Sequence, residues 1–231
     1  MQKFSVPWDN EGTVLGLLKY IYNNMDKTIA FRSNCKNEHC GECGIRIDDK
    51  AALACRTIVD KNTVTLKPLA KIPVLKDLAV DLEKINEHLL RSLAMFKEKD
   101  HTVPDIKDQN ELWFKAGKCN SCFLCMSVCP LCNYEDSLMG GPAIFVGISQ
   151  YLLRNPSSEK TVEILHQVIS QRLLQCTLCG NCQKVCPLEV NPSEIVRSLF
   201  SEIKKHGIKV EDNVPLVKAI ESKNRLEETS D

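Results

Sequence analysis

Residues 119–130 read Cys-Asn-Ser-Cys-Phe-Leu-Cys-Met-Ser-Val-Cys-Pro, and residues 176–187 repeat the spacing as Cys-Thr-Leu-Cys-Gly-Asn-Cys-Gln-Lys-Val-Cys-Pro. Both runs follow the bacterial C-x2-C-x2-C-x3-C-P pattern, whose thiolates bind cubane [4Fe–4S] clusters. Three closely spaced thiolates from one loop hold one side of a cube, and the fourth must come from elsewhere. In proteins with two such runs, the fourth cysteine of each run binds the other cluster. The sequence therefore predicts two interlocked cubane sites.

The predicted ligand sets exchange one cysteine between the first run (residues 119–130) and the second run (residues 176–187). The first [4Fe–4S] cluster is predicted to bind to Cys119, Cys122, Cys125 and Cys186. The second [4Fe–4S] cluster is predicted to bind to Cys129, Cys176, Cys179 and Cys182. Neither run can then complete its cluster alone.

A further group of cysteines lies nearer the N-terminus, at Cys35, Cys40, Cys43 and Cys55. Its C-x4-C-x2-C…C spacing is the plant-type [2Fe–2S] pattern. Gly41 and Gly44 suit a tight loop, because glycine tolerates positive φ and lets backbone N–H groups approach the cluster sulfurs. A zinc site is the alternative, but zinc sites favour paired C-x2-C knuckles.

These three sites use twelve of the thirteen cysteines and none of the five histidines. Cys132 is left over and is interpreted as a free buried thiol, with a replacement ligand or a redox thiol as the alternative. His39 lies inside the predicted [2Fe–2S] loop, but four cysteines already complete that site. The remaining histidines are interpreted as surface residues rather than ligands: His88, His101, His166 and His206.

The composition is ordinary for a globular protein, with a formal net charge of +0. Nucleic-acid and anionic-membrane partners favour a basic excess, so neither is expected. An odd number of cysteines argues against a closed disulfide framework, and residues 1–10 carry no recognisable export signal. A reducing, cytoplasmic compartment is therefore expected. The longest mostly apolar stretch, residues 142–153, is too short to span a bilayer, so any membrane association is expected to come through partner subunits.

The first part of the chain is predicted to mix helix and strand. Alternating residues 2–6 predict a strand, and Thr13 is a suitable N-cap for a following helix. Residues 45–47 and 51–54 predict a hairpin, and residues 64–66 a closing strand. A small sheet with one helix across it is a β-grasp pattern.

From residue 74 onward, apolar residues recur at spacings of three and four, which predicts helices. The helical segments are expected at residues 74–99, 111–116, 142–153, 161–174 and 192–206, with a polar stretch at 97–110. The charged tail after Gly207 is expected to be only loosely ordered. The predicted fold class is α+β, with one domain over residues 1–72 and a second over residues 73–231.

These residues, in this order, resemble the iron–sulfur subunit of succinate dehydrogenase and fumarate reductase over about residues 4–205. The resemblance rests on the cysteine groups, on Thr-Ile-Ala-Phe-Arg-Ser at 28–33, on Lys-Asp-Leu at 76–78, on Asp81 and on Gly-Pro-Ala at 141–143. It implies an N-terminal β-grasp [2Fe–2S] ferredoxin domain followed by an α-helical ferredoxin domain. It also implies a flavoprotein partner with FAD next to the [2Fe–2S] centre, and electrons passing in sequence through the clusters.

The chain differs from the common pattern of that family in three ways. Cys179 stands where the usual member has another residue and a [3Fe–4S] cluster, so a [4Fe–4S] cluster is implied, as in archaeal-type and thiol-linked relatives. Asn133, Tyr134 and Thr177 stand where quinone-site Trp and His residues are common. The N-terminus is short, so the first β-hairpin of the usual domain is expected to be incomplete.

The first functional hypothesis is a subunit that relays electrons from or to an FAD-containing succinate or fumarate enzyme subunit. Its further redox partner could be a quinone- or thiol-reactive subunit. A second hypothesis keeps the relay but assigns the flavoprotein a different enoate or organic acid. A third is a structural zinc protein or a stand-alone ferredoxin-like carrier. The sequence contains no P-loop, G-x-G-x-x-G fingerprint or nucleophile–base pair, so the chain is expected to serve electron transport without a catalytic centre of its own.

Overall fold

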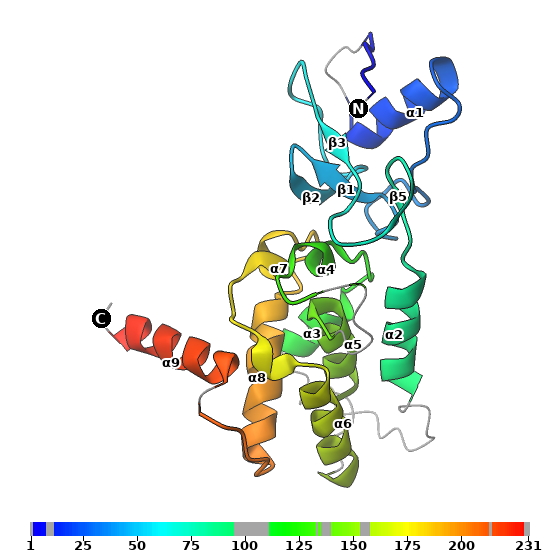
Figure 1. Ribbon diagram of the computed structural model, residues 1–231. Coiled ribbons are helices and arrows are strands. Elements are labelled where there is room, and N and C mark those ends of the chain that lie inside the picture. Colours follow the sequence, from blue (N-terminus) through cyan, green and yellow to red (C-terminus); the bar gives the residue numbers. More distant parts are fainter. Residues whose placement is uncertain are drawn as a thin grey trace.

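The computed structural model describes residues 2–7, 12–94, 111–132, 134, 140–152, 158–212 and 214–228. A small unit built on a β-sheet and one helix lies at the top of Figure 1, and a bundle of helices lies below it. The predicted α+β class is confirmed. The polar stretch 97–110, with His101, and Asn133 lie outside the described residues.

The first unit contains the predicted helix, α1 (Val14–Asn24). Thr13 caps it, because its Oγ1 accepts a hydrogen bond from the backbone N–H of Gly16 at 3.2 Å. The apolar side of α1 faces the core, and its buried residues are Val14, Leu15, Leu17, Leu18 and Ile21. The predicted cap and helix are therefore confirmed.

The sheet of the first unit has the strand order β2-β1-β3. β1 (Gly44–Ile47) and β2 (Lys50–Leu53) form the predicted antiparallel hairpin. Between them, Asp48 and Asp49 have φ values of 47° and 66°, as a tight two-residue turn requires. β3 (Leu66–Lys67) pairs with β1, one to two residues beyond its predicted place.

The predicted strand over residues 2–6 is wrong. These residues form no strand, although Phe4 and Val6 pack partly against the core. An alternating segment becomes a strand only when another strand satisfies its backbone groups, and the sheet offers residues 2–6 no such partner.

The predicted helix from residue 74 is also wrong over its first part. β4 (Val74–Lys76) and β5 (Ala79–Val80) form a second hairpin, and α2 begins only at Glu83 (Glu83–Ala94). The hairpin is bonded to the first unit: Leu78 N donates to Ala30 O at 3.0 Å, and Ala30 N donates to Asp77 Oδ2 at 2.9 Å. These tertiary bonds outweigh the helical periodicity of the segment.

The lower unit packs around α5 (Pro142–Leu152), which contacts α2, α3, α4, α6 and α8. Most of α5 is buried, as expected for a helix that is apolar on all sides. Its neighbours are α3 (Glu111–Gly117), α4 (Leu124–Val128), α6 (Ser158–Ser170), η2 (Leu173–Gln175), α7 (Asn181–Lys184) and α8 (Pro192–Lys205). The four helices predicted after residue 110 are confirmed, although α6 begins at Ser158 and ends at Ser170, before the predicted end at residue 174. The short helices α4 and α7 were not predicted.

The tail after Gly207 is not loosely ordered throughout, because α9 spans Pro215–Glu228. Leu216 and Val217 are buried, and α9 contacts η2. Figure 1 shows α9 reaching away from the bundle beside α8. The sequence-based expectation followed the high charge of this segment and overlooked the few apolar residues that pack it against the bundle.

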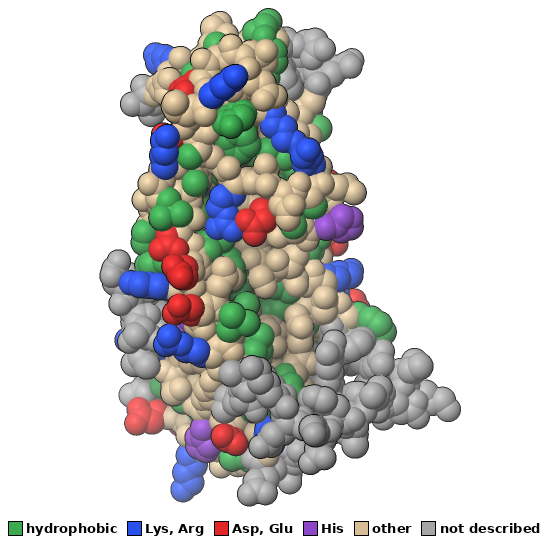
Figure 2. All heavy atoms as spheres, turned by 90° about the vertical axis from the view of Figure 1, so that its right-hand side faces the viewer, with side chains coloured by type: hydrophobic (Ala, Val, Ile, Leu, Met, Phe, Trp, Pro, Cys, Tyr) green, Lys and Arg blue, Asp and Glu red, His purple; other side chains and the backbone are tan. Residues whose placement is uncertain are grey.

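The surface agrees with the balanced composition. On the face shown in Figure 2, Lys and Arg side chains lie among Asp and Glu side chains, with apolar side chains between them. Within the described residues, no helix combines the length and apolar character needed to cross a membrane.

Candidate metal centres

The N-terminal cysteine loop (residues 35–43) folds around its own thiols. Asn37 N and Cys40 N donate to Cys35 Sγ at 3.4 and 3.3 Å, and Cys35 N donates to Cys40 Sγ at 3.4 Å. Lys36 and Glu38 have left-handed φ values of 61° and 60°, and such turns form concave arrays of N–H donors. These donors lower the pKa of Cys35 to about 7, which favours the metal-binding thiolate.

The hairpin β1–β2 brings the other two thiols of this group together. Cys43 lies just before β1 and Cys55 just after β2, and Cys55 N donates to Cys43 Sγ at 3.4 Å. Burial raises the pKa of Cys43 to about 12, and repulsion from Cys55 and Cys40 adds to the shift. The structure therefore pairs Cys35 with Cys40 and Cys43 with Cys55, and Cys40 lies near enough to Cys43 to affect its pKa.

The two cubane runs have the same backbone conformation. In the first run Ser121 and Phe123 have φ values of 54° and 58°, and in the second Leu178 and Gly180, at the same offsets, have 49° and 76°. Positive φ is costly for a bulky residue, and the Phe123 and Leu178 side chains are buried, which holds them in place. A short helix, α4 or α7, follows in each run.

One cavity is lined by the thiols of Cys119, Cys122, Cys125 and Cys186. Its volume is about 370 Å³, part of it open to solvent, and the other lining residues are mainly apolar. Burial raises the pKa of Cys122 to about 11, and it raises the pKa of Cys125 well above its usual value. Val190 N donates to Cys186 Sγ at 3.4 Å, so the sulfur that comes from the second run also has a backbone donor.

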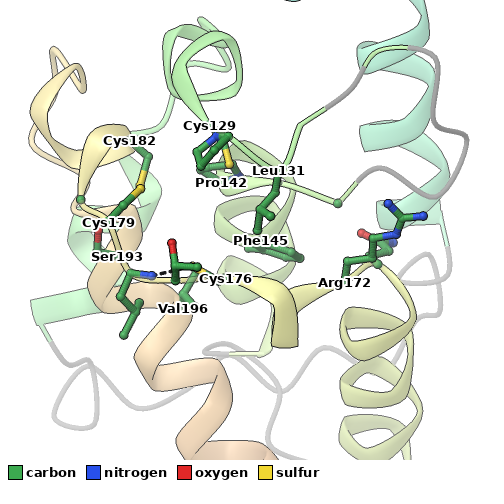
Figure 3. A pocket seen from close by; sticks show the side chains of 17 residues that line it. Cys129, Leu131, Pro142, Phe145, Arg172, Cys176, Cys179, Cys182, Ser193 and Val196 are labelled. Atoms are coloured by element: carbon green, nitrogen blue, oxygen red, sulfur yellow. Dashed lines mark hydrogen bonds between the residues drawn. The ribbon is translucent and has the colours of Figure 1, made fainter. Parts of the chain in front are cut away.

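A second cavity, of about 660 Å³ including space open to solvent, is lined by Cys129, Cys176, Cys179 and Cys182. Figure 3 shows Cys179 and Cys182 on one side and Cys129, from the other run, across from them. Leu178 N donates to Cys176 Sγ at 3.4 Å, and Cys182 Sγ lies 3.6 Å from Ser193 Oγ. Burial raises the pKa of Cys176 to about 11, whereas Cys179 is exposed.

Each cavity thus takes three cysteines from one run and the last cysteine of the other. Cys186 lies with the first run and Cys129 lies with the second. This is the exchange that the sequence predicts. Four thiols around a cavity, with backbone donors to several sulfurs, are a donor set that suits an iron–sulfur cluster. Among the described residues, no group of three or more Cys, His, Asp or Glu side chains is arranged to hold a single metal ion.

Cys132 lines neither of these two cavities. Its side chain is buried, with Sγ 3.8 Å from Met126 Sδ and 3.7 Å from Gly140 O. A hydrogen bond with Cys129, together with burial, raises the pKa of Cys132 well above its usual value. The sequence predicts a free, buried thiol at this position, and the side chain is buried.

The described histidines do not line the two cavities. His39 and His166 are exposed, and His206 is half-buried. His88 is also half-buried, with its Nε2 atom inside, and burial lowers its pKa.

The N-terminal cysteine loop lies directly against the first cubane run. A Cβ atom on Gly41 would lie 2.5 Å from Cys122 Cβ, so only glycine allows this approach. Asn120 Nδ2 donates to His39 O at 3.0 Å across the same contact. Asn120 was not predicted as a site residue, and the glycine between Cys40 and Cys43 is the only sequence signal of the contact.

Replacing Gly41 with alanine is expected to lower the melting temperature of the cluster-loaded chain. Its φ of 72° costs a Cβ-bearing residue about 1–2 kcal/mol, and crowding against Cys122 adds roughly 1–3 kcal/mol. Gly207→Ala is the matched control, since Gly207 has a φ of 69° and nothing within 4 Å of the added Cβ. Equal losses of melting temperature in the two variants would show that the contact with Cys122 is unimportant.

Two families of known domains match the chain in the order that the cysteine groups predict. The 2Fe-2S iron-sulfur cluster binding domain matches residues 1–87. The 4Fe-4S dicluster domain matches residues 115–190. Each of the two regions contains the cysteine groups described above.

Three similar proteins agree with these matches. One subunit of the fumarate reductase (CoM/CoB) of Methanothermobacter marburgensis is 31% identical over 90% of this chain. The fumarate reductase iron-sulfur subunit of Haemophilus influenzae is 27% identical over 85% of this chain and 83% of its own length. A chain of the Mycobacterium smegmatis Sdh1 complex in the apo form has a TM-score of 0.71 at 21% identity, covering 87% of this chain and 88% of that one, and thus shares the fold.

The fold and the thiol sets define an iron–sulfur electron-transfer protein with a [2Fe–2S] domain followed by a [4Fe–4S] dicluster domain. More particularly, the chain is similar over most of its length to subunits of fumarate reductases, and it shares its fold with a chain of the Sdh1 complex. It spans only 42% of the length of the Methanothermobacter protein and 49% of a relative from Methanococcus maripaludis.

Proposed function

We propose that the chain relays electrons between an FAD-containing subunit that converts succinate or fumarate and a further redox partner. The observation that carries this proposal is that each thiol set contacts the next one along the chain. The N-terminal cysteine loop touches the first cubane run through Gly41 and Cys122. The two cubane runs in turn exchange Cys129 and Cys186, so neighbouring sites share structural elements.

The proposed ligand scheme places three clusters on twelve cysteines. The [2Fe–2S] cluster binds to Cys35, Cys40, Cys43 and Cys55. The first [4Fe–4S] cluster binds to Cys119, Cys122, Cys125 and Cys186, and the second to Cys129, Cys176, Cys179 and Cys182. The division of the chain at residues 72 and 73 stays a prediction.

Bound iron–sulfur clusters supply one-electron transfer, and the residues of this chain hold and tune them. Backbone N–H groups donate to the sulfurs of Cys35, Cys176 and Cys186, which stabilises added negative charge. Among the twelve thiols, Cys35 and Cys179 are the exposed ones, in the first and the last set. Electrons would enter and leave the chain near these two residues.

The cluster of the second cubane site is proposed to be [4Fe–4S], because Cys179 supplies the fourth thiol of that site. Thr177 lines the same cavity, where a quinone-site histidine is common in the resembled family. The further partner is therefore proposed to be a thiol-reactive or quinone-reactive subunit that supplies its own binding groups.

Co-purification of the chain with its FAD-containing partner tests the proposed activity. The complex is expected to reduce fumarate with a low-potential dye and to oxidise succinate with an acceptor dye. If the complex converts another enoate or organic acid but neither fumarate nor succinate, the proposed substrate is wrong. The proposal that this chain relays electrons would still stand.

A stand-alone carrier is distinguished by gel filtration of a native extract under anaerobic conditions. The relay subunit is expected to elute with its partners, well above the 26.0 kDa of the chain. Elution near 26.0 kDa would favour the stand-alone carrier.

A further inference from the structure

Two cations of the first unit reach across to the two cubane runs. Lys71 Nζ donates to the backbone carbonyl of Cys129. Arg56 Nη1 donates to the backbone carbonyl of Pro187, the residue after Cys186. Lys71 therefore contacts the first run at Cys129, and Arg56 contacts the second run next to Cys186. These two cysteines are the ones that line the cavity of the opposite run.

The position of Lys71 is fixed by its neighbours in the chain. Leu69 and Ile72 are both buried in the core, with 3% and 6% of their surfaces exposed. Lys71 lies between them with a left-handed φ of 63°. The two buried side chains and the backbone turn direct the lysine to the first run, although the residue itself is exposed.

The charges of the two cations are balanced differently. Arg56 forms an ion pair with Glu38, at 3.5 Å between Nη1 and Oε2. Among the ion pairs of the described residues, none involves Lys71. Lys71 Nζ thus brings to the backbone carbonyl of Cys129 a positive charge that no carboxylate among the described residues pairs with.

We propose that Lys71 is a positioning residue of the first unit that raises the reduction potential of the second cubane through Cys129. This inference rests on the ligand scheme of the proposed function. Reduction adds one electron, and hence one negative charge, to the cluster. A cation beside one of its ligands stabilises that charge, and net charge and hydrogen bonds are among the properties that set cluster potentials.

The test is a redox titration of the cluster-loaded full chain, followed by EPR, in wild type and in Lys71→Met, Lys71→Arg and Arg56→Met. Lys71→Met is expected to shift the second cubane to a more negative midpoint potential, by more than either other cluster shifts. Lys71→Arg should restore most of the wild-type value. Arg56→Met, the matched control, should leave the second cubane unchanged. Because Lys71 is exposed, its effect should shrink at high ionic strength.

An unmoved potential of the second cubane in Lys71→Met, with all three clusters present, would overturn this inference alone. A shift of the first cubane instead would contradict the assignment of Cys129 to the second. If Lys71→Met assembles without the second cubane, Lys71→Gln, which keeps a donor without the charge, gives the same measurement. Loss of the cluster in both variants would make Lys71 a structural residue and likewise overturn the inference. Absence of the second cubane from wild type would contradict the ligand scheme itself.

Discussion

Replacing Cys129 with alanine is expected to remove the second cubane, although Cys129 belongs to the first run. Cys129 lies with the cysteines of the second run at the larger cavity. Without its thiolate that cluster loses a ligand from the opposite loop, and the iron content should fall from about ten to about six per chain. Iron analysis with EPR of the reduced variant measures the loss.

Cys132→Ala is the matched control for this experiment. Cys132 is a buried thiol three residues further on, and it lines neither cavity. The control should keep all of its iron. Cys186→Ala should give the reciprocal result, with the first cubane lost and the second kept. Loss of the first cubane from Cys129→Ala would contradict the interlocked scheme.

Replacing Cys179 with serine is expected to convert the second cubane to a [3Fe–4S] form. Cys179 is the exposed thiol of its set, so the iron it binds is the one that solvent reaches most easily. The other three thiolates keep their positions, and one iron should be lost from about ten. EPR of the oxidised variant should show a new three-iron signal.

The signals of the [2Fe–2S] centre and of the first cubane should not change in Cys179→Ser. Cys132→Ser is the matched control for this variant and should show no three-iron signal. A full iron count in Cys179→Ser, without the three-iron EPR signal, would contradict the assignment of Cys179 as a ligand.

Local signals in the sequence predicted much of the fold. Thr13 caps α1 as expected, and the two aspartates between β1 and β2 adopt the positive φ values of a tight turn. Features that depend on distant partners could not be predicted. The segment at residues 74–80 has helical spacing, yet its bonds to Ala30 make it a hairpin.

The cysteine sets were predictable because cluster ligation imposes a fixed spacing on each loop. The contacts between the sites were not. Asn120, Arg56 and Lys71 all donate to backbone carbonyls, and any sequence offers such acceptors at every position. Only the packing of the first unit on the helical bundle selects which carbonyls they meet.

The most direct test of the account is the iron and acid-labile sulfide content of the purified wild-type chain, with EPR of the reduced form. Three clusters on twelve cysteines require about ten irons and about ten sulfides per chain, and signals from one [2Fe–2S] and two [4Fe–4S] centres. Zinc without acid-labile sulfide, or iron for only one cubane, would contradict it.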